Sequence, residues 1–110
     1  MITQRMLDLP NQNLWSRASK LRHSLEQARL CNTPTRQQSY IVKEGLYFIV
    51  EEMRKLPREG EPSPEYVTAW HYVCNAYEYA KNIKYKDGNS LGFLVKMALE
   101  AVEAIESIDP

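Results

Sequence analysis

The sequence has few glycines, few cysteines and no long apolar run. Its 110 residues include only four glycines and six prolines, too few for a collagen-like or low-complexity disordered chain. A membrane-spanning helix needs about 20 predominantly apolar residues, and no segment of this sequence approaches that length. With 44% hydrophobic and 25% charged residues, the chain is predicted to form one compact domain without membrane association.

The two cysteines, Cys31 and Cys74, belong to no Cys-x-x-Cys pair or other metal-ligand spacing. We therefore expect buried free thiols rather than a disulfide or a zinc site. The first residues, Met1 to Met6, lack the apolar stretch behind basic residues that a secretory signal needs. The expected location is the cytoplasm.

Residues that carry catalytic or cofactor chemistry are also scarce, since His23 and His71 are the only histidines. A di-iron bundle needs Glu-x-x-His steps on facing helices, and the sequence has none, nor does it have a glycine-rich phosphate loop. Cys74 follows His71 by three residues, but it falls toward the apolar side of its helix, where burial raises a thiol pKa and makes it unreactive. We predict no catalytic, cofactor-binding or metal-binding residues, and hence no enzyme.

Apolar residues recur every three or four positions in four segments, which is the pattern of amphipathic helices. The segments are residues 11–31, 34–56, 65–84 and about 90–108. Thr33 before Pro34, and Ser63 before Pro64, suit an N-cap followed by proline at the first helical position. The first stripe consists of Leu14, Ala18, Leu21, Leu25 and Ala28, and the second of Val42, Leu46, Ile49, Met53 and Leu56.

The connections between these segments are short, which makes helices that follow each other in sequence run antiparallel. Two prolines and a glycine at 57–62 exclude a helix there, and residues 86–90 form a polar turn. The predicted fold is an all-α, single-domain, up-down-up-down four-helix bundle over residues 11–110. Residues 1–10 are predicted to be an N-terminal extension.

The net charge is zero, with 14 basic and 14 acidic residues, but the charge is unevenly distributed. Residues 1–36 carry +4, residues 37–88 carry −1 and residues 89–110 carry −3. The basic surface predicted on the first helix consists of Arg17, Lys20, Arg22 and Arg29. One interpretation is pairing with acidic residues of the last helix, its neighbour in such a bundle. The other is a binding surface for an acidic protein or a phosphate backbone.

The third predicted helix is rich in aromatic residues. Its apolar face consists of Tyr66, Trp70, Val73, Tyr77 and Ala80, which we assign to the core. Tyr72 lies at the margin of this face and Tyr79 on the polar side, so both are expected to be at least partly exposed. With His71 and Asn75 they have the composition of a protein-binding hot spot.

The second predicted helix carries more apolar surface than one flank of a four-helix core needs. Tyr47 belongs to this extra apolar surface. Gly45 lies in the middle of the helix, where glycine costs about 1 kcal/mol of helix stability relative to alanine. Close approach of another backbone would explain the glycine. Dimerisation through the second and third helices would account for both residues. The alternative is that residues 1–10 cover the extra apolar surface of the second helix.

These observations favour a binding function. The first hypothesis is a non-enzymatic protein-protein interaction factor, such as an adaptor, inhibitor, immunity or regulatory protein, which binds a protein partner and possesses a surface suited to homodimerisation. The second is an accessory nucleic-acid-binding protein that uses the basic first helix, less favoured because such domains are usually basic overall. The third is a ligand-binding or enzymatic bundle with a pocket between the second and third helices near Gly45, Tyr47 and Trp70.

Overall fold

The computed structural model describes residues 12–55, 62–83 and 88–108, and this part of the chain consists of four α-helices without a β-strand. The helices are α2 (Gln12–Leu30), α3 (Thr35–Lys55), α4 (Pro64–Asn82) and α5 (Gly88–Glu106). The predicted all-α four-helix bundle is therefore confirmed. The predicted N-terminal extension, residues 1–10, and most of the predicted loop at 57–62 lie outside the described residues.

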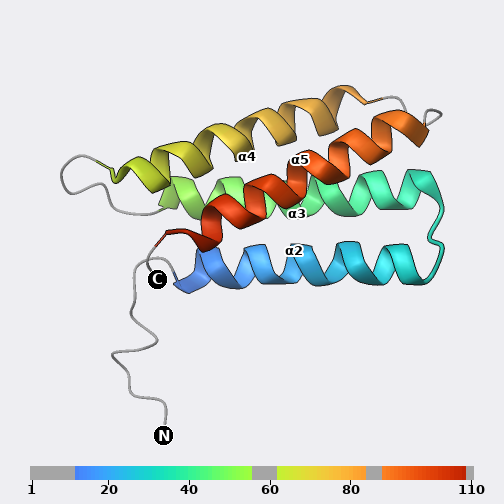
Figure 1. Cartoon of the computed structure of the whole chain (residues 1–110), viewed down its shortest axis with the longest axis horizontal. Coiled ribbons are helices and arrows are strands. Elements are labelled where there is room, and N and C mark those ends of the chain that lie inside the picture. The colour runs from blue at the N-terminus through green and yellow to red at the C-terminus, as the bar shows by residue number, and fades with distance from the viewer. Residues whose placement is uncertain (1–11, 56–61, 84–87, 109–110) are drawn as a thin grey trace, which may run out of the picture.

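Successive helices run antiparallel, as the short connections require (Figure 1). Each helix packs on the one before it, and α5 also packs on α2, which closes the bundle. Helices α3 and α5 are in contact across the diagonal. As a result α5 covers one side of the α2–α3 pair, and the other side of that pair faces away from α5.

The end of α2 and the start of α4 are set by local capping. Asn32 adopts a left-handed conformation with φ of 50°, and the amide of Thr33 donates to the carbonyl of Ala28 at 3.0 Å. This is a Schellman arrangement, in which asparagine replaces the usual glycine. At α4 the amide of Tyr66 donates to Oγ of Ser63 at 3.2 Å, which confirms Ser63 as the N-cap.

The α2–α3 turn differs from the prediction in two respects. Helix α3 begins at Thr35 rather than at Pro34, and the side-chain amide of Gln38 donates to the carbonyl of Thr33. Cys31 is a free thiol but is exposed, because it sits in this surface turn immediately after α2. Cys74 is also free and only half-buried. The expectation of buried thiols is therefore wrong for Cys31.

Small residues form the centre of α4. Its buried side chains are those of Ala69, Val73, Ala76 and Ala80. The aromatic residues assigned to the core, Tyr66, Trp70 and Tyr77, pack against it but are only partly buried. The hydroxyl of Tyr66 donates to the carbonyl of Met53 at 2.8 Å and thereby ties the start of α4 to α3.

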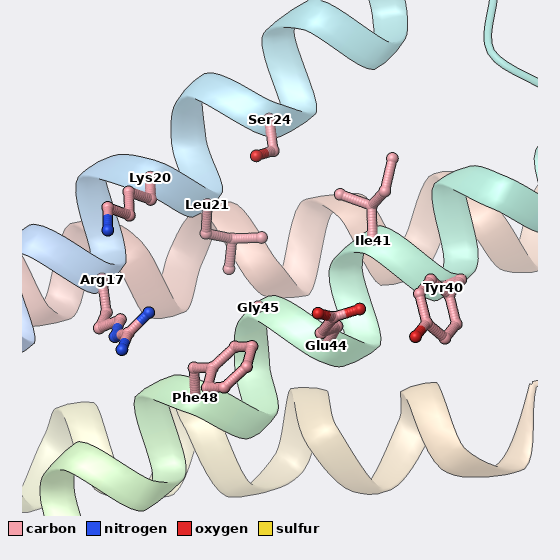
Figure 2. Close-up of a pocket in the computed structure, with 9 residues that line it drawn as sticks. All are labelled: Arg17, Lys20, Leu21, Ser24, Tyr40, Ile41, Glu44, Gly45 and Phe48. Atoms are coloured by element: carbon pink, nitrogen blue, oxygen red, sulfur yellow. The ribbon is translucent and has the colours of Figure 1, made fainter.

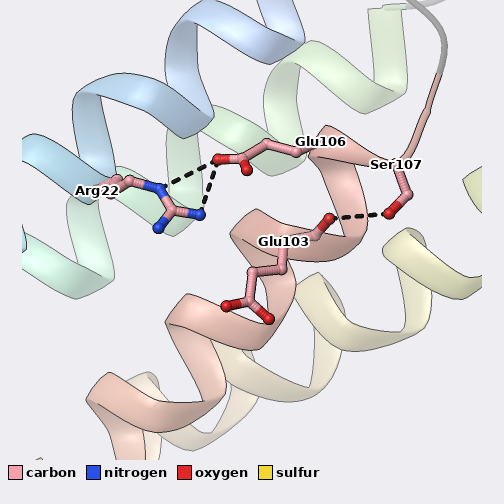
Figure 3. A network of polar contacts seen from close by, with 4 residues as sticks. All are labelled: Arg22, Glu103, Glu106 and Ser107. Carbon is pink, nitrogen blue, oxygen red and sulfur yellow. Dashed lines mark hydrogen bonds and ion pairs between the residues drawn. The ribbon is translucent and has the colours of Figure 1, made fainter.

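The predicted pairing of the first and last helices is present. Arg22 of α2 donates from Nε and Nη2 to the same oxygen of Glu106 on α5, at 3.1 and 2.9 Å (Figure 3). On the same end of α5, Oγ of Ser107 donates to the carbonyl of Glu103 at 3.2 Å. Because both members of the ion pair are partly exposed, their attraction contributes little more than about 0.5 kcal/mol.

Candidate functional site

An open groove of about 270 Å³ lies between α2 and α3. It is on the side of these helices that faces away from α5, whose ribbon passes behind them in Figure 2. Residues one helical turn apart line both walls. On α2 these are Arg17, Lys20, Leu21 and Ser24, and on α3 they are Tyr40, Ile41, Glu44, Gly45 and Phe48.

Gly45 and Leu21 form the floor of the groove. A Cβ atom on residue 45 would lie 2.5 Å from Cδ1 of Leu21, well inside contact distance. Leu21 is almost completely buried, with 2% of its surface exposed, so it has little room to move away. The neighbour that explains this mid-helix glycine is therefore a side chain of the same chain, rather than the backbone of another.

The two ends of the groove carry opposite charges. Arg17 and Lys20 lie at the end near Phe48, and Glu44 lies on the other side of Gly45 (Figure 2). The guanidinium of Arg17 is 4.9 Å from the centre of the Phe48 ring and 4.0 Å from the carboxylate of Glu52. These contacts hold one cation in place at the basic end.

At the acidic end, the carboxylate of Glu44 accepts a hydrogen bond from the hydroxyl of Tyr40. This bond, and secondarily the negative charge of the carboxylate, raises the pKa of the Tyr40 hydroxyl above its usual value.

Three aromatic side chains of α3 are exposed: Tyr40 and Phe48 line the groove, whereas Tyr47 contacts Tyr77 on the α4 side of the helix. Tyr40, Tyr47 and Phe48 have 62%, 44% and 38% of their surface exposed. At about 200 Å² per aromatic side chain, these fractions leave about 290 Å² of aromatic surface in contact with solvent. We call these three residues the α3 aromatic strip.

Two residues of the α3 aromatic strip, Tyr47 and Phe48, are held in place by ring contacts. The rings of Tyr47 and Phe48 meet edge to face with centroids 5.7 Å apart, and Tyr47 also lies 6.3 Å from Tyr77 of α4. Such aromatic pairs are favourable beyond the area that they bury. A rigid aromatic surface loses little conformational entropy when it binds a partner.

The interface residues predicted on α4 occupy a different part of the molecule. His71, Tyr72 and Asn75 are exposed, as expected. Tyr79 is half-buried, because its ring packs at 5.2 Å against Phe93 of α5 and against the core. Tyr79 faces α5, whereas Tyr47 and Gly45 lie on α3, so the structure does not bring the six predicted interface residues into one surface.

The basic surface predicted on the first helix is divided as well. Arg17 and Lys20 line the groove beside α3, whereas Arg22 pairs with Glu106 of α5. Arg29 follows Arg22 by seven residues, almost two helical turns, and therefore lies on the same side as Arg22. The four cations form two pairs on opposite margins of α2.

The pocket expected near Gly45, Tyr47 and Trp70, between the second and third predicted helices, stays a prediction, and of these residues only Gly45 lines the groove described here. The groove that contains Gly45 lies between the first and second predicted helices, and its aromatic wall is Phe48. A sequence signal for it exists, because Ile41, Gly45 and Phe48 are spaced by four and three residues and share one helix face. The partner helix across that face was not evident from the sequence.

The surroundings of Cys74 and His71 do not favour nucleophilic chemistry. Burial raises the pKa of the Cys74 thiol, and the charge of Glu78 raises it further, while Arg54 acts in the opposite direction. His71 is exposed. Within the described ranges, no three His, Cys, Asp or Glu side chains are placed to hold a metal ion together.

Comparison with models of protein families, with curated proteins and with solved structures finds no match to this chain. None of the helices in the described part of the chain is long and apolar enough to span a membrane. The surface of α2 and α3 therefore has to be interpreted on its own chemistry.

Proposed function

We propose that this protein is a non-enzymatic interaction factor that binds another protein chain through the groove between α2 and α3 and the adjoining α3 aromatic strip. The observation that carries the proposal is the exposure of Tyr40, Tyr47 and Phe48 on one helix, beside a groove with charged ends. The role would be that of an adaptor, inhibitor or regulatory protein.

The composition of this surface supports protein binding. Tyrosine, phenylalanine and arginine are enriched at protein interfaces relative to the rest of the surface. The exposed aromatic area of about 290 Å² is comparable with the lower bound for the largest apolar patch on a typical monomer, about 300 Å². Arg17, stacked on Phe48 and paired with Glu52, adds a fixed guanidinium to this surface.

The division of the basic residues supports a protein over a nucleic acid as the partner. A nucleic-acid-binding helix normally presents a continuous basic stripe to successive phosphates. Arg17 and Lys20 of α2 share the groove with the acidic residue Glu44 of α3. Arg22 is already paired with Glu106. As the compartment of this function we propose the cytoplasm, where an exposed thiol such as Cys31 remains reduced.

Photo-crosslinking from a defined position tests the proposal. Tyr40 is replaced by a photoreactive benzoylphenylalanine, and a matched control carries the same replacement at Tyr72, which is exposed on α4 and does not line the groove. Irradiation of cells that make the protein should yield a discrete crosslinked protein from position 40 and little from position 72. Absence of any product, or equal products from both positions, would contradict the proposed surface.

A further inference from the structure

The charges of the groove have an arrangement that is complementary to itself. Arg17 and Lys20 lie at one end, and Glu44 lies beyond Gly45 toward the other (Figure 2). Lys20 is exposed and has no ion pair with any other described residue. Glu44 is exposed too and is bonded by the Tyr40 hydroxyl rather than by a cation. Lys20 at one end and Glu44 at the other can therefore each take an oppositely charged partner.

In an interface with two-fold symmetry, a patch meets its own copy, so that residue i contacts residue j and residue j contacts residue i. Suppose that two copies face each other through their α2–α3 faces and that a two-fold axis perpendicular to the groove relates them. The basic end of each groove then lies over the acidic end of the other. The α3 helices then run antiparallel, and Tyr40 and Phe48, which line the groove, lie on the face that meets the other copy. Turned the other way, like ends would meet and repel.

The size of this face suits a dimer. Helix α3 has 21 residues, which gives a length of about 31 Å at 1.5 Å per residue. Two packed helices are about 20 Å wide, given axes 8–10 Å apart and helix diameters of 10–12 Å. The resulting footprint of about 600 Å² approaches the roughly 800 Å² that each partner contributes to a standard interface.

We propose that a second copy of this chain occupies the α2–α3 groove, with the two α3 helices antiparallel and with Arg17 and Lys20 of each copy facing Glu44 of the other. The inference rests on the proposed function, because it names the partner of the same surface. It explains why exposed aromatic rings lie directly beside charges of both signs.

Charge exchange between copies tests this arrangement. The mass of the purified chain is measured by size-exclusion chromatography with light scattering, and twice the 12.8 kDa chain mass is expected. The variants Arg17→Glu/Lys20→Glu and Glu44→Lys should each have a dimer dissociation constant raised at least about tenfold, since like charges then face each other. An equimolar mixture of the two variants should return to the dimer mass, because every facing pair is again complementary.

Matched controls lie outside the groove. Arg29→Glu, on the other margin of α2, and Glu103→Lys, exposed on α5, should leave the dimer mass unchanged. Circular dichroism reports whether each variant is folded. If the double variant loses helix, Lys20→Glu alone takes its place, because Lys20 is exposed and makes no ion pair in the described part of the chain that its replacement would break.

Three results would overturn the inference. One is a single-chain mass for the unmodified protein at the highest concentration that can be loaded. Another is a dimer that persists in both groove variants, which would place the contact elsewhere. The third is a pair of monomeric variants that fail to associate on mixing. A single-chain mass combined with crosslinking of position 40 to a different protein would leave the proposed function standing while this inference falls.

Discussion

The indole Nε1 of Trp15 donates a hydrogen bond of 2.8 Å to the carbonyl of Ile108, 93 residues further along the chain. Trp15 stands in the first turn of α2, and Ile108 is a buried residue just after α5. The bond therefore joins the two ends of the described helical bundle. Together with the Arg22–Glu106 pair, it fixes α5 against α2 and leaves the opposite side of α2 open for the groove.

Replacing Trp15 by phenylalanine should destabilise the protein by about 1–2 kcal/mol. An aromatic ring remains, although a smaller one, but the carbonyl of Ile108 loses its donor, and an unsatisfied, partly buried carbonyl costs about that much. Thermal unfolding followed by circular dichroism should show a midpoint lower by at least about 4 °C for a chain of this size. An unchanged midpoint would mean that the bond does not close the bundle.

Gly45→Ala should destabilise the protein by about 1 kcal/mol, although alanine is the better helix former. The gain in helix propensity is about 1 kcal/mol, but the new Cβ would lie 2.5 Å from the almost fully buried Leu21, and such overpacking costs about 1–3 kcal/mol. In a Leu21→Ala background the same substitution should stabilise by about 1 kcal/mol, because the obstacle is gone. Urea denaturation of the four proteins measures both effects, and the same sign in both backgrounds would contradict the packing.

Tyr79→Ala should cost about 2 kcal/mol, whereas Tyr72→Ala should cost less than about 1 kcal/mol. Tyr79 packs against Phe93 and the core, so its removal leaves a gap. Tyr72 has 42% of its surface exposed and loses less contact. Comparing unfolding midpoints of the two variants checks this, and equal midpoints would show that Tyr79 does not pack between α4 and α5. A Tyr72→Ala/Tyr79→Ala variant is therefore unsuitable as a test of binding alone.

The two thiols should react at very different rates. Cys31 is exposed, whereas burial raises the pKa of Cys74 and lowers the fraction of reactive thiolate near neutral pH. Since the pKa of Cys74 is raised, its alkylation rate should continue to increase at pH values above its usual pKa. Labelling the Cys31→Ser and Cys74→Ser variants with iodoacetamide across pH separates the two rates. Faster labelling of Cys74 at neutral pH would contradict its half-buried position.

Local patterns in the sequence were enough to predict where the helices lie and that they form an antiparallel bundle. The period of the apolar residues marks one face of each helix, and Ser63 followed by Pro64 starts α4 because of local backbone chemistry alone. These signals lie within one or two turns of chain. They also sufficed to anticipate the exposure of Tyr72 and a link between the first and last helices.

Which helix faces meet became evident only from the packed bundle. Tyr66, Trp70 and Tyr77 lie near the same face of α4 as the alanines Ala69, Ala76 and Ala80, but α4 packs closely against both α3 and α5. Short side chains fill the middle of such a contact, and large rings are displaced to its margins. For the same reason the groove depends on Leu21 and Gly45, which are distant in sequence and become neighbours only when α2 docks on α3. Helical periodicity specifies a direction around one helix axis, and the identity of the neighbour in that direction is a property of the whole packed chain.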